Sequence, residues 1–416
     1  MNGRTLLFLS LLQTHDPVSR SASRLIRQHA ILPPWFKATD SVRITILQGA
    51  FLPVPPVRGG AIEKVWFRLG KAFVREGHEV VHVSRLSDDL PSSEIIEGVN
   101  HVRVRGFEAT ASSLLLKWRD FRYVLRARRA LPQADILVTN AFWAPILVRD
   151  SSLGAQYVHI GRYPKGQMKL YGRARRLQSP SEAIAAAIRS EVPSKADLVK
   201  AIPYPLSWDL VEPPPANESR EQTILYLGRI HPEKGLCELV KAFEGLPKKL
   251  SKQWRLDIRG PWKASEGGGG KGFLETLKGL AGSVKEAIRF LDPVFDDGKL
   301  RDELGRASLF AYPSMAERGE TFGLAALEAM SCGCPPLVSG LGCFRDFVQD
   351  GSTGFVFDHR GGGAVANLRV KMIEVLSKPE RLSLIGNAAN RQAQNFTLDR
   401  VSKRFLDDFS SILPAS

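Results

Sequence analysis

The chain has 416 residues, which is too long for one ordinary hydrophobic core and suits two domains with a cleft between them. Its 44% hydrophobic and 24% charged residues are typical of a globular protein and exclude wholesale disorder. The net charge of +15 predicts a surface that attracts anions, but charge alone does not choose among phosphates, acidic lipids, acidic glycans and nucleic acid.

Residues 1–40 are the hardest part of the chain to interpret. A short apolar run, Thr5–Leu12, precedes a stretch rich in serine and arginine. A signal or transit peptide, a non-conforming extension and an upstream start all stay open. The first convincing strand begins only at Val42.

From Val42 the sequence predicts a first doubly wound α/β domain over residues 41–202. An apolar strand is followed by a loop rich in proline and glycine, a helix over Ala61–Arg75 and a second strand over His78–Ser84. This order predicts a βαβ crossover onto a parallel sheet covered on both faces. Further strands are expected at 100–104, 134–139 and 156–160, and further helices at 114–131 and 181–191.

A second domain of the same kind is predicted over residues 220–390. Five prolines between Ile202 and Pro215 stiffen the chain, so we place a linker at 203–219. The last segment, 391–416, contains an amphipathic helix over Leu398–Leu413. The strands expected in the second domain cover residues 223–227, 255–259, 288–291, 309–312, 336–338 and 354–357.

The cysteine content and the length of the apolar runs limit where in the cell the protein is expected. Four cysteines in a chain of this length predict a reducing compartment, and we expect a cytoplasmic protein. Cys332, Cys334 and Cys343 lack the paired spacing and fourth ligand of a zinc site, so we expect no metal. No apolar run approaches the roughly 18 residues that a membrane-spanning helix needs, so membrane contact would be peripheral.

The most informative segment runs from Glu320 to Glu328. A helix starting near Phe322 would direct the free N–H groups of Phe322, Gly323 and Leu324 toward the cleft, where they form a phosphate site. At roughly 1.5 Å per residue, the two carboxylates would lie about 12 Å apart along the helix axis. That spacing matches a sugar at one end and a ribose at the other, and two ordinary solvated glutamates are the alternative.

The loop after the first strand of the second domain supplies two cations. Arg229 offers a fork of donors and Lys234 a point charge, which together can neutralise a diphosphate as it departs. A glycine run, Gly267–Gly270, precedes Lys271 but lacks the serine or threonine of a phosphate-binding loop. We interpret this run as a flexible insertion.

The first domain offers three further candidates. Gly59 and Gly60 follow the first strand, where the backbone must approach a substrate closely, and a plain tight turn is the alternative. His159 ends a strand at the edge where open α/β sheets present ligands, and a satisfied core histidine is the alternative.

Together these segments resemble the family-4 group of retaining glycosyltransferases with the GT-B fold, which comprises two Rossmann-like domains facing a central cleft. The resemblance covers roughly residues 42–413 and includes the Arg58–Glu63 loop and the Gly77–Val80 strand entry. It implies that Arg229 and Lys234 hold the diphosphate of a nucleotide-diphosphate sugar. By the same resemblance Glu320 and His159 contact the donor sugar, Glu328 binds the ribose, and the last helix returns to the first domain.

The expected activity is therefore retaining transfer of a hexosyl-type sugar, without metal and without a cofactor beyond the donor. The acceptor stays unidentified: a polysaccharide, a lipid-linked sugar or a small molecule. A catalytically silent glycan- or anion-binding protein on the same fold and a sugar-nucleotide epimerase are the alternatives. We expect no nucleic-acid partner.

A basic amphipathic segment, Trp118–Leu131, allows two interpretations. Its apolar and arginine side chains would suit peripheral contact with an anionic membrane. We favour the plainer interpretation, in which the apolar side faces the core and the arginines face water.

Overall fold

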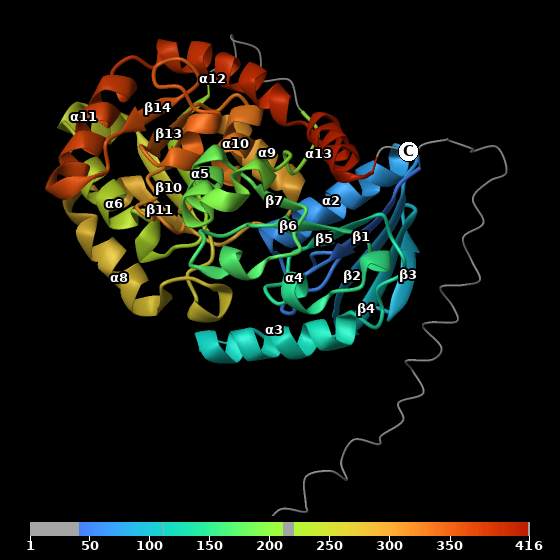
Figure 1. The fold of residues 1–416 in the computed structure, drawn as a ribbon. Coiled ribbons are helices and arrows are strands. Elements are labelled where there is room, and N and C mark those ends of the chain that lie inside the picture. The colour runs from blue at the N-terminus through green and yellow to red at the C-terminus, as the bar shows by residue number, and fades with distance from the viewer. Residues whose placement is uncertain (1–40, 111, 211–219, 415–416) are drawn as a thin grey trace, which may run out of the picture.

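The computed structural model describes residues 41–110, 112–210 and 220–414, which form two α/β units, each built on its own sheet (Figure 1). The interpretations of residues 1–40 and most of the predicted linker lie outside these residues. The predicted architecture of two largely parallel α/β sheets is confirmed, and the boundaries of several elements are close to those expected from the sequence.

The N-terminal sheet has eight strands in the order β3-β4-β2-β1-β5-β6-β7-β8. Strand β1 lies in its interior and pairs in parallel with β2 and β5, so that its carboxyl end meets the carboxyl ends of both neighbours. The strands are β1 (Arg43–Leu47), β2 (Glu79–Leu86), β3 (Ser93–Ile96), β4 (Val99–Arg105), β5 (Ile136–Thr139), β6 (Ala155–His159), β7 (Arg176–Ser179) and β8 (Val199–Ala201).

One strand departs from the predicted all-parallel sheet. Strand β3 pairs with β4 antiparallel at the edge of the sheet, through a hairpin that turns at Glu97 and Gly98. This strand was not predicted because it is short and alternates between exposed and half-buried residues. Strands β7 and β8 were also not predicted, and each has only three or four residues.

The helices of the N-terminal unit bury apolar faces against this sheet. Trp66, Leu69 and Phe73 of α2 are fully buried and belong to the same hydrophobic cluster as Ile44 and Ile46 of β1. This buried face follows the i, i+3, i+7 spacing that predicted the helix. The helices are α2 (Ala61–Arg75), α3 (Ser113–Ala127), α4 (Ala144–Leu147) and α5 (Glu182–Glu191).

The C-terminal sheet has six parallel strands in the order β11-β10-β9-β12-β13-β14. Strands β10 and β11 begin and end at the predicted residues. The strands are β9 (Glu221–Leu227), β10 (Arg255–Arg259), β11 (Ile288–Leu291), β12 (Ala307–Tyr312), β13 (Pro336–Ser339) and β14 (Phe355–Phe357). The helices of this unit are α6 (Leu236–Glu244), α7 (Lys248–Gln253), α8 (Gly270–Leu280), α9 (Asp297–Arg306), α10 (Leu324–Ser331), α11 (Ala364–Leu376) and α12 (Glu380–Ala393).

The last helix, α13 (Leu398–Ile412), lies against the N-terminal unit (Figure 1). Phe405 packs on Trp66 of α2 and Phe409 packs on Tyr157 of β6. Asp408 accepts a hydrogen bond from the Tyr157 hydroxyl at 2.8 Å. The chain therefore leaves the C-terminal unit after α12 and ends as part of the N-terminal core.

Within the described residues, no helix combines the length and the apolar character that crossing a bilayer requires.

Candidate active site

The loop that follows β9 places two cations at the carboxyl edge of the C-terminal sheet. Lys234 ends a short 3-10 helix, and its side chain is almost fully buried. The Arg229 side chain is 44% exposed and donates to the Gly267 carbonyl at 2.8 Å and to Glu233 at 2.7 Å. One predicted cation is therefore fixed inside the protein, while the other lies at the surface of the site.

Lys234 connects the two predicted motifs directly. Its Nζ donates to Glu320 Oε2 at 2.7 Å and to the Tyr312 hydroxyl at 2.9 Å. Gly235 allows this approach, because its φ is 70° and a Cβ there would lie 2.0 Å from the Pro313 carbonyl oxygen. Burying an ion pair costs desolvation free energy that the attraction barely offsets, so such a pair is weak evidence for stability and favours a functional role.

Helix α10 begins at Leu324, two residues later than the start expected near Phe322. Gly323 precedes it with a φ of 86°, and a Cβ there would lie 2.3 Å from the Phe344 ring. Glu320 therefore lies in the loop before the helix, so the spacing of about 12 Å expected from helical rise does not apply. No side chain among the described residues caps the first turn, in which Ala326 and Leu327 donate to the Gly323 carbonyl, so the N–H groups that precede them can face an anion.

Phe322 and Glu328 meet different environments. The Phe322 side chain is buried against Tyr204 and Phe347, so only its backbone can face a substrate. Glu328 lies within α10 and accepts a short hydrogen bond from the Ser207 hydroxyl. Burial raises the pKa of Glu328 to about 6, although the Ser207 hydrogen bond acts in the opposite direction.

The double glycine lies on the N-terminal unit immediately before α2. Gly59 and Gly60 both have positive φ, 77° and 103°. A Cβ on Gly60 would lie 2.3 Å from a carboxylate oxygen of Glu63, which is the acidic residue of the first turn of α2. Burial raises the pKa of Glu63, and its hydrogen bond with Gln48 acts in the opposite direction. The backbone therefore passes close to a buried carboxyl group.

His159 has protein partners at both ring nitrogens. Nδ1 lies 2.5 Å from Gln178 Oε1 and Nε2 lies 3.0 Å from the Tyr204 hydroxyl. The Gln178 amide donates to two backbone carbonyls, so its Oε1 is the acceptor and His159 Nδ1 carries the proton. Burial lowers the pKa of His159 to about 4, so its ring is neutral at pH 7. Both ring nitrogens thus have protein partners in this structure, and contact between His159 and a donor sugar stays a prediction.

The two units meet around these residues. The Ser181 hydroxyl donates to the Thr321 carbonyl at 2.6 Å, and the Thr321 hydroxyl lies 3.4 Å from the Gly161 carbonyl. Lys64 of α2 pairs with Asp297 at the start of α9 at 2.6 Å. The loop holding Glu320 thus touches the segment that follows His159, although the two are far apart in sequence.

Several residues around the site were not predicted. Tyr312, Ser207, Lys64 and Asp297 carried no sequence signal because their roles come from tertiary contacts alone. The interpretation of Gly267–Gly270 as a flexible insertion is wrong: the Gly269 N–H donates to the Ile230 carbonyl at 2.8 Å, and Gly267 accepts from Arg229. This segment therefore supports the basic loop. Hydrogen bonds of this kind cannot be predicted from a run of glycines in the sequence.

In the described part of the chain, no group of three or more His, Cys, Asp or Glu side chains is arranged to hold a metal ion. Cys332, Cys334 and Cys343 are buried and unpaired by disulfides. Burial raises the pKa of Cys332 to about 11, so its thiol is protonated at neutral pH.

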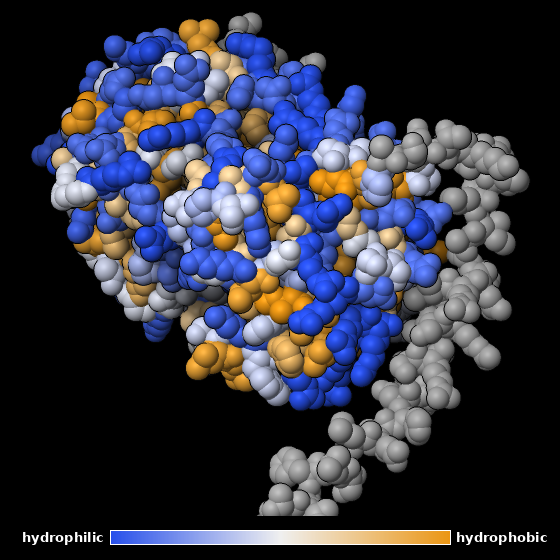
Figure 2. All heavy atoms as spheres, in the orientation of Figure 1, coloured by the Kyte–Doolittle hydropathy of each residue, from blue (hydrophilic) through white to orange (hydrophobic). Residues whose placement is uncertain are grey.

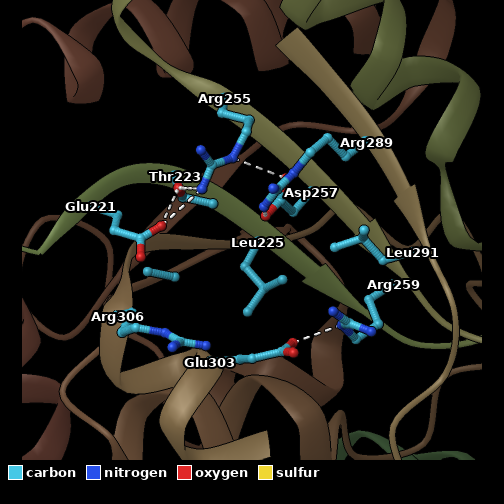
Figure 3. A pocket seen from close by; sticks show the side chains of 11 residues that line it. Glu221, Thr223, Leu225, Arg255, Asp257, Arg259, Arg289, Leu291, Glu303 and Arg306 are labelled. Atoms are coloured by element: carbon cyan, nitrogen blue, oxygen red, sulfur yellow. Dashed lines mark hydrogen bonds and ion pairs between the residues drawn. The ribbon is translucent and has the colours of Figure 1, made fainter. Parts of the chain in front are cut away.

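A pocket of about 470 Å³ lies on the C-terminal sheet between β9–β11 and α9, and none of the predicted site residues line it (Figure 3). Its charges are largely paired with one another. Arg255 contacts Glu221 at 2.8 Å, Arg259 contacts Glu303 at 2.7 Å, and Arg289 contacts Asp257. An ion-pair network therefore occupies a sheet face that α/β proteins usually fill with apolar side chains.

Sequence comparison connects the C-terminal unit to known transferases. The family model described as glycosyl transferases group 1 matches residues 211–392. The chain is 31% identical over 172 residues to a phosphatidyl-myo-inositol mannosyltransferase of Mycobacterium leprae, covering 41% of this chain and 42% of the relative. It is 30% identical over 196 residues to a D-inositol 3-phosphate glycosyltransferase of Rhodococcus opacus, covering 46% and 41%. The alignments thus span less than half of either relative.

Structural comparison extends over most of the chain. A sucrose-phosphate synthase of Thermosynechococcus elongatus superposes with a TM-score of 0.73 at 19% identity, covering 89% of this chain and 99% of that one. HepE of Anabaena, solved in complex with UDP and glucose, superposes with a TM-score of 0.65 at 17% identity, covering 89% and 100%. At these identities the likeness establishes the fold. The chain therefore has the GT-B fold, and its residues 211–392 match the family model described as glycosyl transferases group 1.

Proposed function

We propose that the chain transfers a hexosyl-type sugar from a nucleotide-diphosphate sugar to an acceptor, with retention of anomeric configuration and without a metal ion. The observation that carries the proposal is the buried Lys234–Glu320 pair beside the uncapped start of α10. A cation, a carboxylate and free N–H groups at one edge of a sheet suit a sugar diphosphate better than any other common metabolite class.

Each of these groups has a defined task in the proposal. Arg229, Lys234 and the first turn of α10 stabilise the negative charge that develops on the departing diphosphate. Glu320 accepts hydrogen bonds from the sugar hydroxyls while it holds the Lys234 ammonium in place. Glu328 exchanges its Ser207 hydrogen bond for one from the ribose. Gly59 and Gly60 allow the backbone to approach the transferred sugar from the N-terminal unit.

His159 acts in this proposal as a neutral, fixed ring. Its Nδ1–H is committed to Gln178, so only Nε2 can face the donor, and it can do so by giving up the Tyr204 hydroxyl. A ring with a pKa near 4 does not serve as a general acid at neutral pH. Its contribution is therefore contact with the sugar rather than proton transfer.

The acceptor class rests on the named relatives. The names of these relatives refer to phosphatidyl-myo-inositol and to D-inositol 3-phosphate. We propose a glycan, a lipid-linked sugar or a small polyol as the acceptor, held on the N-terminal unit near the double glycine. The HepE complex supports a uridine nucleotide as the first donor to test.

Calorimetric titration of UDP, GDP and ADP, each with and without a chelator, tests the donor half of the proposal. We expect one nucleotide to bind and its affinity to be unchanged by the chelator. Arg229→Gln removes a half-exposed side chain and should fold normally, while weakening binding roughly 10- to 100-fold, the typical loss for a hydrogen bond to a charged group. Lys234→Met should weaken it at least as much, with thermal unfolding as a check on folding.

Arg289→Gln is the matched control, because Arg289 is a similarly exposed arginine of the same unit that lines the ion-pair pocket. Its affinity should equal that of the wild type. Failure of all three nucleotides to bind well-folded protein would support the silent binding protein instead. Conversion of a bound sugar nucleotide to its epimer, without transfer, would support the epimerase.

A further inference from the structure

Helix α3 has an apolar outer face as well as an apolar inner face. Its inner residues Tyr123, Val124 and Ala127 are fully buried in the N-terminal core. On the outside, Leu114 is 79% exposed and Trp118 is 51% exposed. The two are four residues apart and share one side of the helix. The favoured expectation, that the apolar side faces the core and the arginines face water, therefore holds for Val124 and Leu131 but not for Trp118.

The outer stripe continues along the helix and lies at the edge of the molecule. Phe121 and Leu125, which follow at helical spacing, are only partly buried. Leu115 is a further exposed side chain next to the stripe. Helix α3 runs along one outer side of the N-terminal unit (Figure 1), and hydrophobic atoms are interspersed with hydrophilic ones on that side (Figure 2). Surface helices normally present a polar outer face, so this stripe needs a partner.

The charges around the stripe are of one sign. Residues 113–129 contain six lysines and arginines and a single acid, Asp120, which is buried and accepts the Trp143 N–H. Arg122 lies over the Trp118 ring at 5.3 Å, and Arg126 donates to the Arg105 carbonyl at 3.0 Å. Among the described residues no carboxylate forms an ion pair with any of these six cations, so their charge remains available to an external anion.

We propose that α3 docks this protein on an anionic lipid bilayer, with the Leu114–Trp118 stripe in the interface and the flanking cations on the headgroups. An apolar stripe bordered by basic side chains is the pattern of helices that lie in the membrane plane. Tryptophan favours the headgroup level, and each cation near an anionic surface contributes about a fivefold increase in binding.

Other occupants fit the surface less well. A symmetric contact between two copies would bring the same cations together, which opposes self-association. Nucleic acid would engage the arginines but offers nothing to exposed aliphatic side chains such as Leu114.

The position of α3 suits a lipid-linked acceptor, an extension that rests on the proposed function. Arg119 of α3 donates to the Glu108 carbonyl at 2.6 Å, and the Glu108 carboxylate pairs with Arg58 at 2.9 Å, immediately before the double glycine. Trp143, which follows β5, donates its indole N–H to the Lys117 carbonyl at 2.8 Å. The docking helix is therefore tied to the carboxyl edge of the N-terminal sheet, where we place the acceptor.

Co-sedimentation of the full chain with lipid vesicles tests the proposal without reference to enzyme activity. We expect binding to vesicles that contain phosphatidylglycerol and little binding to pure phosphatidylcholine. Leu114→Ser with Trp118→Ser should weaken binding at least roughly tenfold, because two exposed apolar side chains no longer insert. Arg122→Gln with Arg128→Gln should weaken it roughly 30-fold at low salt.

Matched controls lie on the C-terminal unit. Leu384→Ser removes an apolar side chain that is 70% exposed on α12, and Lys378→Gln with Arg381→Gln removes two exposed cations. Both should bind like the wild type. Equal binding by the α3 variants and the wild type, equal binding to neutral and anionic vesicles, or self-association abolished by the Leu114 and Trp118 changes would each overturn the proposal. So would binding to RNA without binding to vesicles.

The nucleotide titration and the vesicle assay test two separate proposals, and either proposal can fail without the other. Loss of vesicle binding in the α3 variants with no nucleotide binding would retain the docking surface and reject the transferase. Nucleotide binding together with vesicle binding that does not depend on α3 would retain the transferase and reject the docking surface.

Discussion

Lys234 and Glu320 are 86 residues apart in sequence, and their contact at 2.7 Å gives the candidate site its chemistry. Each was proposed from its own motif, but the sequence contains nothing that says they form a pair. The pairing depends on Gly235 and on the loop after β12, whose backbones approach each other too closely for a Cβ. A diphosphate entering the site would therefore share the Lys234 ammonium group with Glu320.

Glu328 gives a prediction at the residue scale. Its folded pKa of about 6 lies above the ordinary value of 4.5, so the folded protein binds this proton more tightly than the unfolded chain does. The stability that protonation of Glu328 adds to the folded state is complete below pH 4.5 and is lost as the pH rises through 6. Relative to Glu328→Gln, the wild type should lose about 2 kcal/mol of unfolding free energy between pH 4 and pH 7.

Urea denaturation of both proteins across this range measures the difference directly. A difference that stays constant with pH would mean that Glu328 is not held in a desolvated environment. The control is Glu380→Gln, since Glu380 is exposed on α12, and its difference from the wild type should not change over the same interval.

At the scale of elements, hydrophobic periodicity was a reliable guide where a segment was long or fully buried. Helix α2 and strands β10 and β11 match the predicted residues because their apolar positions repeat at 3.6 or form a continuous buried run. The short strands β3, β7 and β8 were not predicted because their few residues establish no period. The outer face of α3 was misjudged because spacing shows which residues share a side but not whether another element covers that side.

Helix α13 carries the prediction at this scale. Asp408 is buried, accepts from the Tyr157 hydroxyl and pairs with Arg176 at 2.9 Å, so it attaches the end of the chain to β6 and β7. Asp408→Ala leaves the guanidinium and the hydroxyl without this partner and should destabilise the protein by about 3 kcal/mol. Guanidinium denaturation is the measurement.

Asp407→Ala is the matched control, because Asp407 is the exposed neighbour on the same helix. It should unfold at the wild-type midpoint. Equal stability of the two variants would show that the packing of Phe405 and Phe409, rather than the Asp408 network, holds α13 in place.

At the scale of the whole molecule, the candidate site depends on both sheets. The C-terminal sheet positions the basic loop and α10, while Lys64, Ser181 and the segment after His159 approach from the N-terminal sheet. The two-unit architecture could be predicted from the sequence because the strand and helix pattern restarts after the proline-rich segment. The contacts between the units could not, because no local signal specifies which loops of two separate sheets will meet.

The central claim is that a nucleotide diphosphate binds at Lys234, Arg229 and the start of α10. A crystal structure with the nucleotide that binds most tightly in solution tests it most directly. We predict diphosphate oxygens within hydrogen-bonding distance of Lys234 Nζ, the Arg229 guanidinium and the first N–H groups of α10. A nucleotide bound instead in the arginine-lined pocket between β10 and α9, with the Lys234–Glu320 pair undisturbed, would contradict the account.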